Sequence, residues 1–195
     1  MSIVERYLEG LKQVLGPDSL KELALASGAS AESLRALRER YPHCPASLLE
    51  LLGHIDGTHF RDYPGGRVAV LMLGSGLFEY PYYLRSVQQI LADGLRYPES
   101  IRDTYEQYLD EYPDIVGPGI DADAPMGERL CFSHCMNNGG SSRLYIDFMP
   151  GPGGVAGQVV QFVHDPDNFE VIADSFDTYL QQRMDEGYAF VFEDE

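Results

Sequence analysis

Residues 143–164 carry the clearest fold signal in the sequence. They read RLYIDF (143–148), MPGPGGVAG (149–157) and QVVQFVH (158–164). The two outer parts are rich in β-branched and aromatic residues, which is typical of strands, and the glycines and prolines between them are typical of a connection. The sequence therefore predicts two neighbouring strands joined by a turn.

Other segments of the chain resemble strands in the same way. Residues 128–135 form a further predicted strand, which the Asn-Gly-Gly turn at residues 138–140 joins to the first of the pair. Two more are expected over residues 67–73 and 77–83, where Pro81 favours an edge position. A last short strand is expected over residues 188–192.

Helical periodicity dominates the first half of the chain. Ser2 and Glu5 form a capping box, and apolar residues then recur at helical spacing. The expected helices cover residues 2–15, 18–27, 30–41, 45–56, 86–95, 98–112 and 174–187, with residues 113–128 as loop and Asp174 as the last cap. Because helices lead and strands cluster later, the order predicts one α+β domain over residues 1–195 with a largely antiparallel central sheet, packed by N-terminal helices and a C-terminal helix.

The charge of the chain is unevenly distributed. The net charge is −17, and residues 1–102 carry twelve acidic and eleven basic residues, whereas residues 103–195 carry nineteen and three. Such a field repels phosphate backbones and anionic lipid, so neither nucleic acid nor a membrane is an expected partner. It attracts basic proteins. The alternative is that the acidity only keeps the protein soluble.

Cysteine use and hydropathy suggest a compartment. Cys44, Cys131 and Cys135 are too few and too irregularly spaced for a disulfide framework. Glu5 and Arg6 interrupt the first apolar run, which argues against a signal peptide, and the longest apolar stretch, residues 68–73, is too short to span a bilayer. We therefore expect a cytoplasmic protein.

No motif in the sequence indicates a cofactor or a metal. The glycine-rich residues 150–157 lack the Lys and Ser/Thr of a phosphate-binding loop and precede a strand, not a helix. On a regular strand Cys131 and Cys135 would share a face about 13 Å apart, with His134 on the other face. The acidic pairs 121/123 and 165/167 do not continue as calcium loops.

Catalysis is the second of three hypotheses, after protein binding, and the third is a purely structural subunit. The chain has no nucleophile-elbow motif, although a dyad of distant residues such as Cys44 with His164 stays open. The enzyme hypothesis is a small-molecule hydrolase or other enzyme that uses His134 or His164 as a general base. It requires a concave pocket with a perturbed histidine beside a carboxylate.

Thirteen tyrosines offer a second indication of binding, because tyrosine combines a large contact area with a polar tip. Tyr82 and Tyr83 are neighbours on a predicted strand, so they face opposite sides, and both are candidate partner-binding residues. We expect Tyr105 and Tyr112 to belong to the core face of a helix.

Two parts of the sequence together resemble the SUKH superfamily, which contains the Smi/Knr cell-wall-synthesis regulators. The first is CPASLLELLGHIDG at residues 44–57. The second comprises LYIDF (144–148), GQVVQFVHD (157–165) and ADSFDTYL (173–180). The likeness spans about residues 30–185, with a helical insertion over about residues 84–128. The chain departs from many members in having no tryptophan.

The resemblance implies an α+β sheet packed by helices, no catalytic residues and no cofactor. It also implies a protein-binding module like the bacterial immunity proteins that neutralise toxins, or like the Smi/Knr regulators. The charge favours a basic partner such as a toxin. Positions carried over from the resemblance are Asp56, Gly57, Asp147, Gln158, His164 and Asp165. Their alternative is structural, as helix cap, turn former or edge residue.

Overall fold

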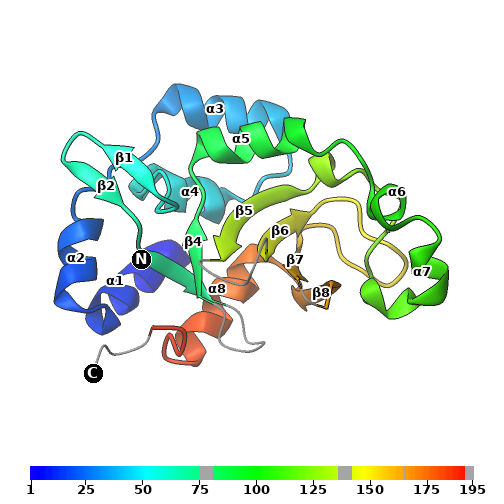
Figure 1. Cartoon of the computed structure of the whole chain (residues 1–195). Coiled ribbons are helices and arrows are strands. Elements are labelled where there is room, and N and C mark those ends of the chain that lie inside the picture. Colours follow the sequence, from blue (N-terminus) through cyan, green and yellow to red (C-terminus); the bar gives the residue numbers. More distant parts are fainter. Residues whose placement is uncertain (75–80, 136–141, 165, 192–195) are drawn as a thin grey trace.

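The computed structural model describes residues 1–74, 81–135, 142–164 and 166–191. Its centre is a six-stranded sheet in which each strand pairs antiparallel with the next strand in the chain (Figure 1). The strands are β3 (Leu71–Gly74), β4 (Pro81–Leu84), β5 (Leu130–Cys135), β6 (Arg143–Asp147), β7 (Gln158–Val163) and β8 (Asn168–Ala173). A separate small ribbon pairs β1 (Arg61–Tyr63) with β2 (Gly66–Val68). The predicted α+β class is confirmed.

Strands β6 and β7 are the two neighbouring strands predicted over residues 143–148 and 158–164. Tyr145 lies opposite Val160 and Asp147 lies opposite Gln158. At the end of the connection Gly157 adopts a φ of 93° and donates its N–H to the carbonyl of Asp147 at 2.7 Å. Glycine suits this position because a side chain is strained at positive φ.

The helices surround the sheet on both sides. They are α1 (Ile3–Val14), α2 (Pro17–Leu23), α3 (Ala31–Arg40), α4 (Ala46–His54), α5 (Val87–Arg96), α6 (Ile101–Tyr105), α7 (Tyr108–Glu111) and α8 (Phe176–Asp185), with 3₁₀ turns η1 (Pro113–Ile115) and η2 (Met126–Glu128). The predicted capping box of Ser2 and Glu5 begins α1. Among the described residues, every helix is too short or too polar to cross a lipid bilayer.

The larger core lies between one face of the sheet and helices α1, α4 and α8. Phe132 of β5 packs edge-on against Phe176 and Tyr179 of α8. The buried phenol of Tyr7 in α1 donates to the carbonyl of Met72 at 2.7 Å, and that of Tyr179 donates to Gly74. These bonds attach β3 to the helices that cover it.

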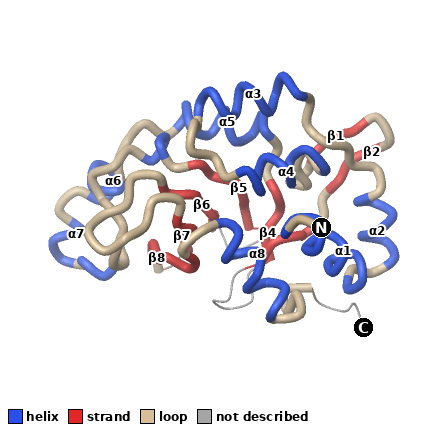
Figure 2. Tube along the Cα trace, turned by 180° about the vertical axis from the view of Figure 1, so that it is seen from behind, coloured by secondary structure: helices blue, strands red, loops and turns tan. Residues whose placement is uncertain are grey.

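The other face of the sheet is covered in part by the long connection between β4 and β5. Ile101, Leu109, Ile115 and Ile120 of this connection form a smaller core with side chains of β5 to β8. Figures 1 and 2 show α6 and α7 at one end of the molecule and α1 and α2 at the opposite end. That this connection is a separate insertion stays a prediction.

Several predicted boundaries are wrong for local reasons. The helix expected over residues 98–112 is two short helices, because Glu106 adopts a φ of 48° between them. The strand expected over residues 67–73 is interrupted at Ala69 and Val70. Residues 188–190 form a turn, whereas β8 was not expected at all. Ser175, not Asp174, caps α8.

Candidate functional site

Asp56 and Gly57 follow α4 in the chain and pack against the N-terminus of α5 in the interior of the fold. The buried Asp56 carboxylate accepts a hydrogen bond from the Val87 N–H at 2.9 Å and pairs with Arg61 at 3.1 Å. Gly57 has a φ of 89°, and a Cβ there would lie 2.4 Å from the backbone nitrogen of Ser86. Both residues therefore join the loop after α4 to the N-terminus of α5.

Asp147 and Gln158 belong to a buried polar cluster. The Asp147 carboxylate pairs with Arg129 Nε at 3.3 Å and accepts from Gln158 Nε2 at 3.1 Å. The same Gln158 amide donates to the carbonyl of Gly119 at 2.8 Å. The three side chains are fully enclosed, so the cluster connects β6, β7 and the loop that contains Gly119.

Tyr82 and Tyr83 face opposite sides of β4, as expected for strand neighbours. The buried Tyr82 hydroxyl accepts from Gln161 Nε2 at 2.8 Å, and Tyr83 packs against His59 and Phe60. Asp56, Gly57, Asp147, Gln158, Tyr82 and Tyr83 are all buried. Direct partner contact by these six residues therefore stays a prediction without support from the structure, and each has a structural role instead.

Among the described residues that the sequence analysis predicts to bind a partner, His164 reaches the surface. Its Nδ1 lies 2.6 Å from Asp167 Oδ1, and the Tyr105 hydroxyl donates to the other oxygen of Asp167. Burial and this carboxylate raise the pKa of Tyr105, so its phenol stays protonated. Asp165 lies outside the described residues.

A cavity of about 400 Å³ opens beside this group. Its lining includes His164 and Asp167 together with Tyr105, Tyr108 and Tyr112. The rings of Tyr108 and Tyr112 lie 4.5 Å apart and each residue is 51% exposed. The expectation that Tyr112 belongs to a helix core is wrong, because the break at Glu106 turns α7 outward. Tyr105 is half-buried against Phe169.

Exposed carboxylates surround these tyrosines. Hydrogen bonds from Gly117 to Phe169 (2.8 Å) and from Asn168 to Asp114 (3.1 Å) hold the segment around η1 against β8. This contact places the acids of α7 and η1 beside the turn that contains His164 and Asp167. We define the acidic tyrosine surface as Tyr105, Tyr108, Tyr112, His164 and Asp167 with the exposed acids Glu106, Asp110, Glu111 and Asp114.

Basic residues do little to neutralise this surface. The three arginines that follow Arg102 are directed inward: Arg129 pairs with Asp147, Arg143 with Asp93 and Arg183 with Glu186. Arg40 and Arg102 from the first half neutralise Glu128 and Asp123. The four exposed acids of the acidic tyrosine surface make no ion pair with any residue that the structure describes.

His134 lies elsewhere, in a cross-strand row on the sheet face opposite the larger core. The centre of its ring lies 4.9 Å from that of the tilted His59 ring, and its Nδ1 lies 2.7 Å from the carbonyl of Cys135. Burial lowers the pKa of His134. The expectation that Cys131 and Cys135 share a face of the strand is wrong. A bulge between Cys131 and Ser133 shifts the alternation of side chains and places Cys135 in the larger core. The described residues contain no group of three or more candidate metal ligands.

A model of a protein family matches the chain. No curated protein matches the chain. The model of the SMI1/KNR4 family (SUKH-1) matches residues 28–182, which include the whole of the six-stranded sheet and most of the helices around it. Since this match covers most of the sequence, the chain belongs to the SMI1/KNR4 family.

Proposed function

We propose that the chain is a protein-binding module of the immunity or Smi/Knr type that docks a basic protein on the acidic tyrosine surface. One observation carries the proposal: four exposed acids without ion pairs lie around two exposed tyrosines beside a cavity of about 400 Å³. Family membership supports an immunity-like or regulatory module. A toxin is the partner class that best combines this family with this charge.

In such a contact the carboxylates and the tyrosine rings affect different properties: the carboxylates affect the approach of the partner, and the rings affect the binding energy. Clustered carboxylates speed the approach of a positively charged protein and set its orientation. Tyrosines such as Tyr108 and Tyr112 offer large, rigid contact areas with polar tips, which are common among residues that dominate binding energy. Because the two rings already pack against each other, docking orders few new side-chain torsions.

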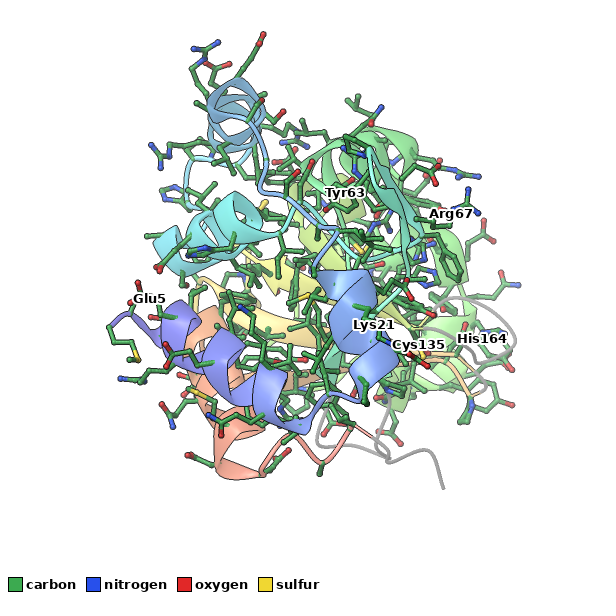
Figure 3. All side chains as sticks on the ribbon, turned by 90° about the vertical axis from the view of Figure 1, so that its left-hand side faces the viewer. Glu5, Lys21, Tyr63, Arg67, Cys135 and His164 are labelled. Carbon is green, nitrogen blue, oxygen red and sulfur yellow. The ribbon has the colours of Figure 1, made fainter. Side chains whose placement is uncertain are left out.

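The test compares two variants of equal net charge. The first carries Glu106→Gln, Asp110→Asn, Glu111→Gln and Asp114→Asn. The control carries Glu9→Gln, Glu32→Gln, Glu39→Gln and Asp185→Asn, which are exposed acids outside that surface. In Figure 3, Glu5 of α1, one turn from Glu9, and His164 lie at opposite edges of the molecule.

Each protein is used to capture partners from native lysate at low and high salt, and the recovered partner is purified for binding measurements. We expect the first variant to lose a basic partner that the wild type and the control retain. Equal loss in both variants would show that net charge alone attracts the partner. Capture of only neutral partners, unaffected by salt, would contradict the proposal.

The enzyme alternative has one observation in its favour, the contact of His164 with Asp167 beside a cavity. The described residues lining this cavity include no serine, threonine or cysteine, so the histidine would have to activate water. Hydrolysis of p-nitrophenyl esters by the wild type, lost in His164→Ala with the fold intact, would support this alternative. Equal background rates would count against it.

A further inference from the structure

A second cavity, of about 340 Å³, lies between the sheet and the connection that contains α6. It shares Tyr105 with the cavity of the acidic tyrosine surface. Five of its eleven lining residues are aromatic: Tyr97, Tyr145, Phe162 and Phe169 beside Tyr105. This volume and composition are typical of pockets that hold small organic molecules.

The position of the cavity follows from the register of the sheet. Residues paired across neighbouring strands face the same side, and one such row crosses all six strands. It consists of Leu71, Tyr83, His134, Arg143, Phe162 and Phe169. Arg143 is the one cation of this row and lies next to Phe162, so the register alone places a guanidinium beside the aromatic wall.

The charges at this end of the cavity do not balance. Asp93 pairs with Arg85 at 3.3 Å and with Arg143 at 3.5 Å, and neither arginine pairs with another acid among the described residues. The neighbouring Cys131 stays a neutral thiol because burial raises its pKa to about 11, and burial also keeps the Tyr145 phenol neutral by raising its pKa. Two guanidiniums therefore share one buried carboxylate, which leaves one positive charge in excess at this buried end. The other carboxylate of the lining belongs to Glu99, an exposed residue that pairs with neither arginine.

This excess charge is largely removed from water. The side chains of Arg85 and Arg143 are 12% and 15% exposed. The Nε atoms of both are buried without a hydrogen-bond acceptor among the described residues. Arg143 donates to the Tyr97 hydroxyl at 3.3 Å, a neutral partner that does not offset the charge. An uncompensated buried cation is costly, and a bound anion would offset that cost.

We propose that this cavity binds a small organic carboxylate, with its apolar body between the aromatic walls and its carboxylate on Arg143. A single negative charge matches the single excess positive charge. Phosphate monoesters carry about two negative charges at neutral pH, and the Glu99 carboxylate that also lines the cavity would repel the second. The chemistry of the cavity therefore favours a monoanion over a phosphorylated ligand.

The test uses matched probes and calorimetric titration. We expect 2-naphthoate to bind saturably to the wild type, and its neutral amide 2-naphthamide and the dianion 2-naphthyl phosphate to bind at least about tenfold more weakly. Arg143→Met should weaken naphthoate binding by a similar factor, and Arg143→Lys should weaken it less. Thr104→Trp, which fills the cavity from its lining, should abolish binding, whereas Gln107→Trp outside the lining should not.

Three results would overturn the proposal. These are equal affinity for naphthoate and naphthamide, tighter binding of the phosphate, and absence of saturable binding by naphthoate, benzoate and octanoate up to about 10 mM. The probe comparison and the Thr104→Trp variant decide the question even if Arg143→Met does not fold.

Discussion

At the scale of single residues, Arg129 and Asp147 form an ion pair whose side chains are 1% and 0% exposed. Removing one partner leaves a buried charge without compensation, so we expect Arg129→Met to lower the free energy of unfolding by about 3–5 kcal/mol. The double variant Arg129→Met/Asp147→Leu should lose less than the sum of the two single changes. Urea denaturation measures all three.

The exposed pair of Arg102 and Asp123 provides the control for this prediction. Its atoms lie 2.6 Å apart, but both side chains are at least half exposed. Arg102→Met should therefore cost about 1 kcal/mol or less. Similar costs for Arg102→Met and Arg129→Met would show that the buried pair does not depend on its enclosure.

A glycine at positive φ can be required by backbone strain alone, or by backbone strain together with a steric clash of a Cβ atom. Gly57 and Gly153 distinguish these two cases. Both have φ near 90°, but a Cβ at Gly57 would lie 2.4 Å from Ser86, whereas one at Gly153 would meet nothing within 4 Å. Gly153→Ala should cost only the backbone strain, about 1–2 kcal/mol. Gly57→Ala should cost clearly more in thermal unfolding. Equal costs would mean that the loop before α5 can move away.

The adjacent, partly buried rings of His59 and His134 predict a dependence of stability on pH. Burial lowers the pKa of His59 to about 4, while an unfolded histidine titrates near about 6.5. Between these values the unfolded state binds more protons, so the free energy of unfolding should fall as pH drops from about 6.5 to about 4. His59→Phe should reduce that slope in denaturation series. Identical slopes in both proteins would contradict the prediction.

At the scale of elements, the break between α6 and α7 depends on Glu106. This exposed residue adopts φ 48° and ψ −128°, a conformation that glycine adopts with far less strain than other residues. Glu106→Gly should raise the free energy of unfolding by about 1 kcal/mol, and Glu106→Ala should not. Asp110→Gly, inside α7, is the control and should lower it. A loss of stability in Glu106→Gly would show that the break is unstrained.

Local signals in the sequence predict the existence of helices and strands better than they predict where these elements begin and end. Ser2 and Ser86 lie at the starts of helices that the sequence predicts, because a capping side chain bonds within one turn. The sequence does not predict strand β8, because Asp165, Pro166 and Asp167 directly before it are residues typical of turns and Glu170 interrupts its apolar residues. The bulge between Cys131 and Ser133 was also missed, since it depends on pairing with β6.

At the scale of the whole molecule, the sequence shows that acids dominate after residue 102, but not where they gather. That depends on the contact of η1 with β8 and on the inward direction of Arg129, Arg143 and Arg183. Asp147 and Gln158, carried over from the family resemblance, belong to motifs that build the sheet, which explains their burial. The exposure of Tyr108 and Tyr112 could not be predicted from the sequence, because it follows from the break at Glu106 and no local sequence pattern indicates that break.

The acidic tyrosine surface predicts a division between the rate of association and the rate of dissociation. With the purified basic partner, neutralising Glu106, Asp110, Glu111 and Asp114 should slow association and flatten its dependence on salt, because long-range attraction acts before contact. Tyr108→Ala should instead speed dissociation, because the ring contributes only once the surfaces meet. Stopped-flow or surface plasmon resonance at several salt concentrations measures both. Tyr97→Ala, on the separate cavity, is the control, and a change in association rate there would place the contact elsewhere.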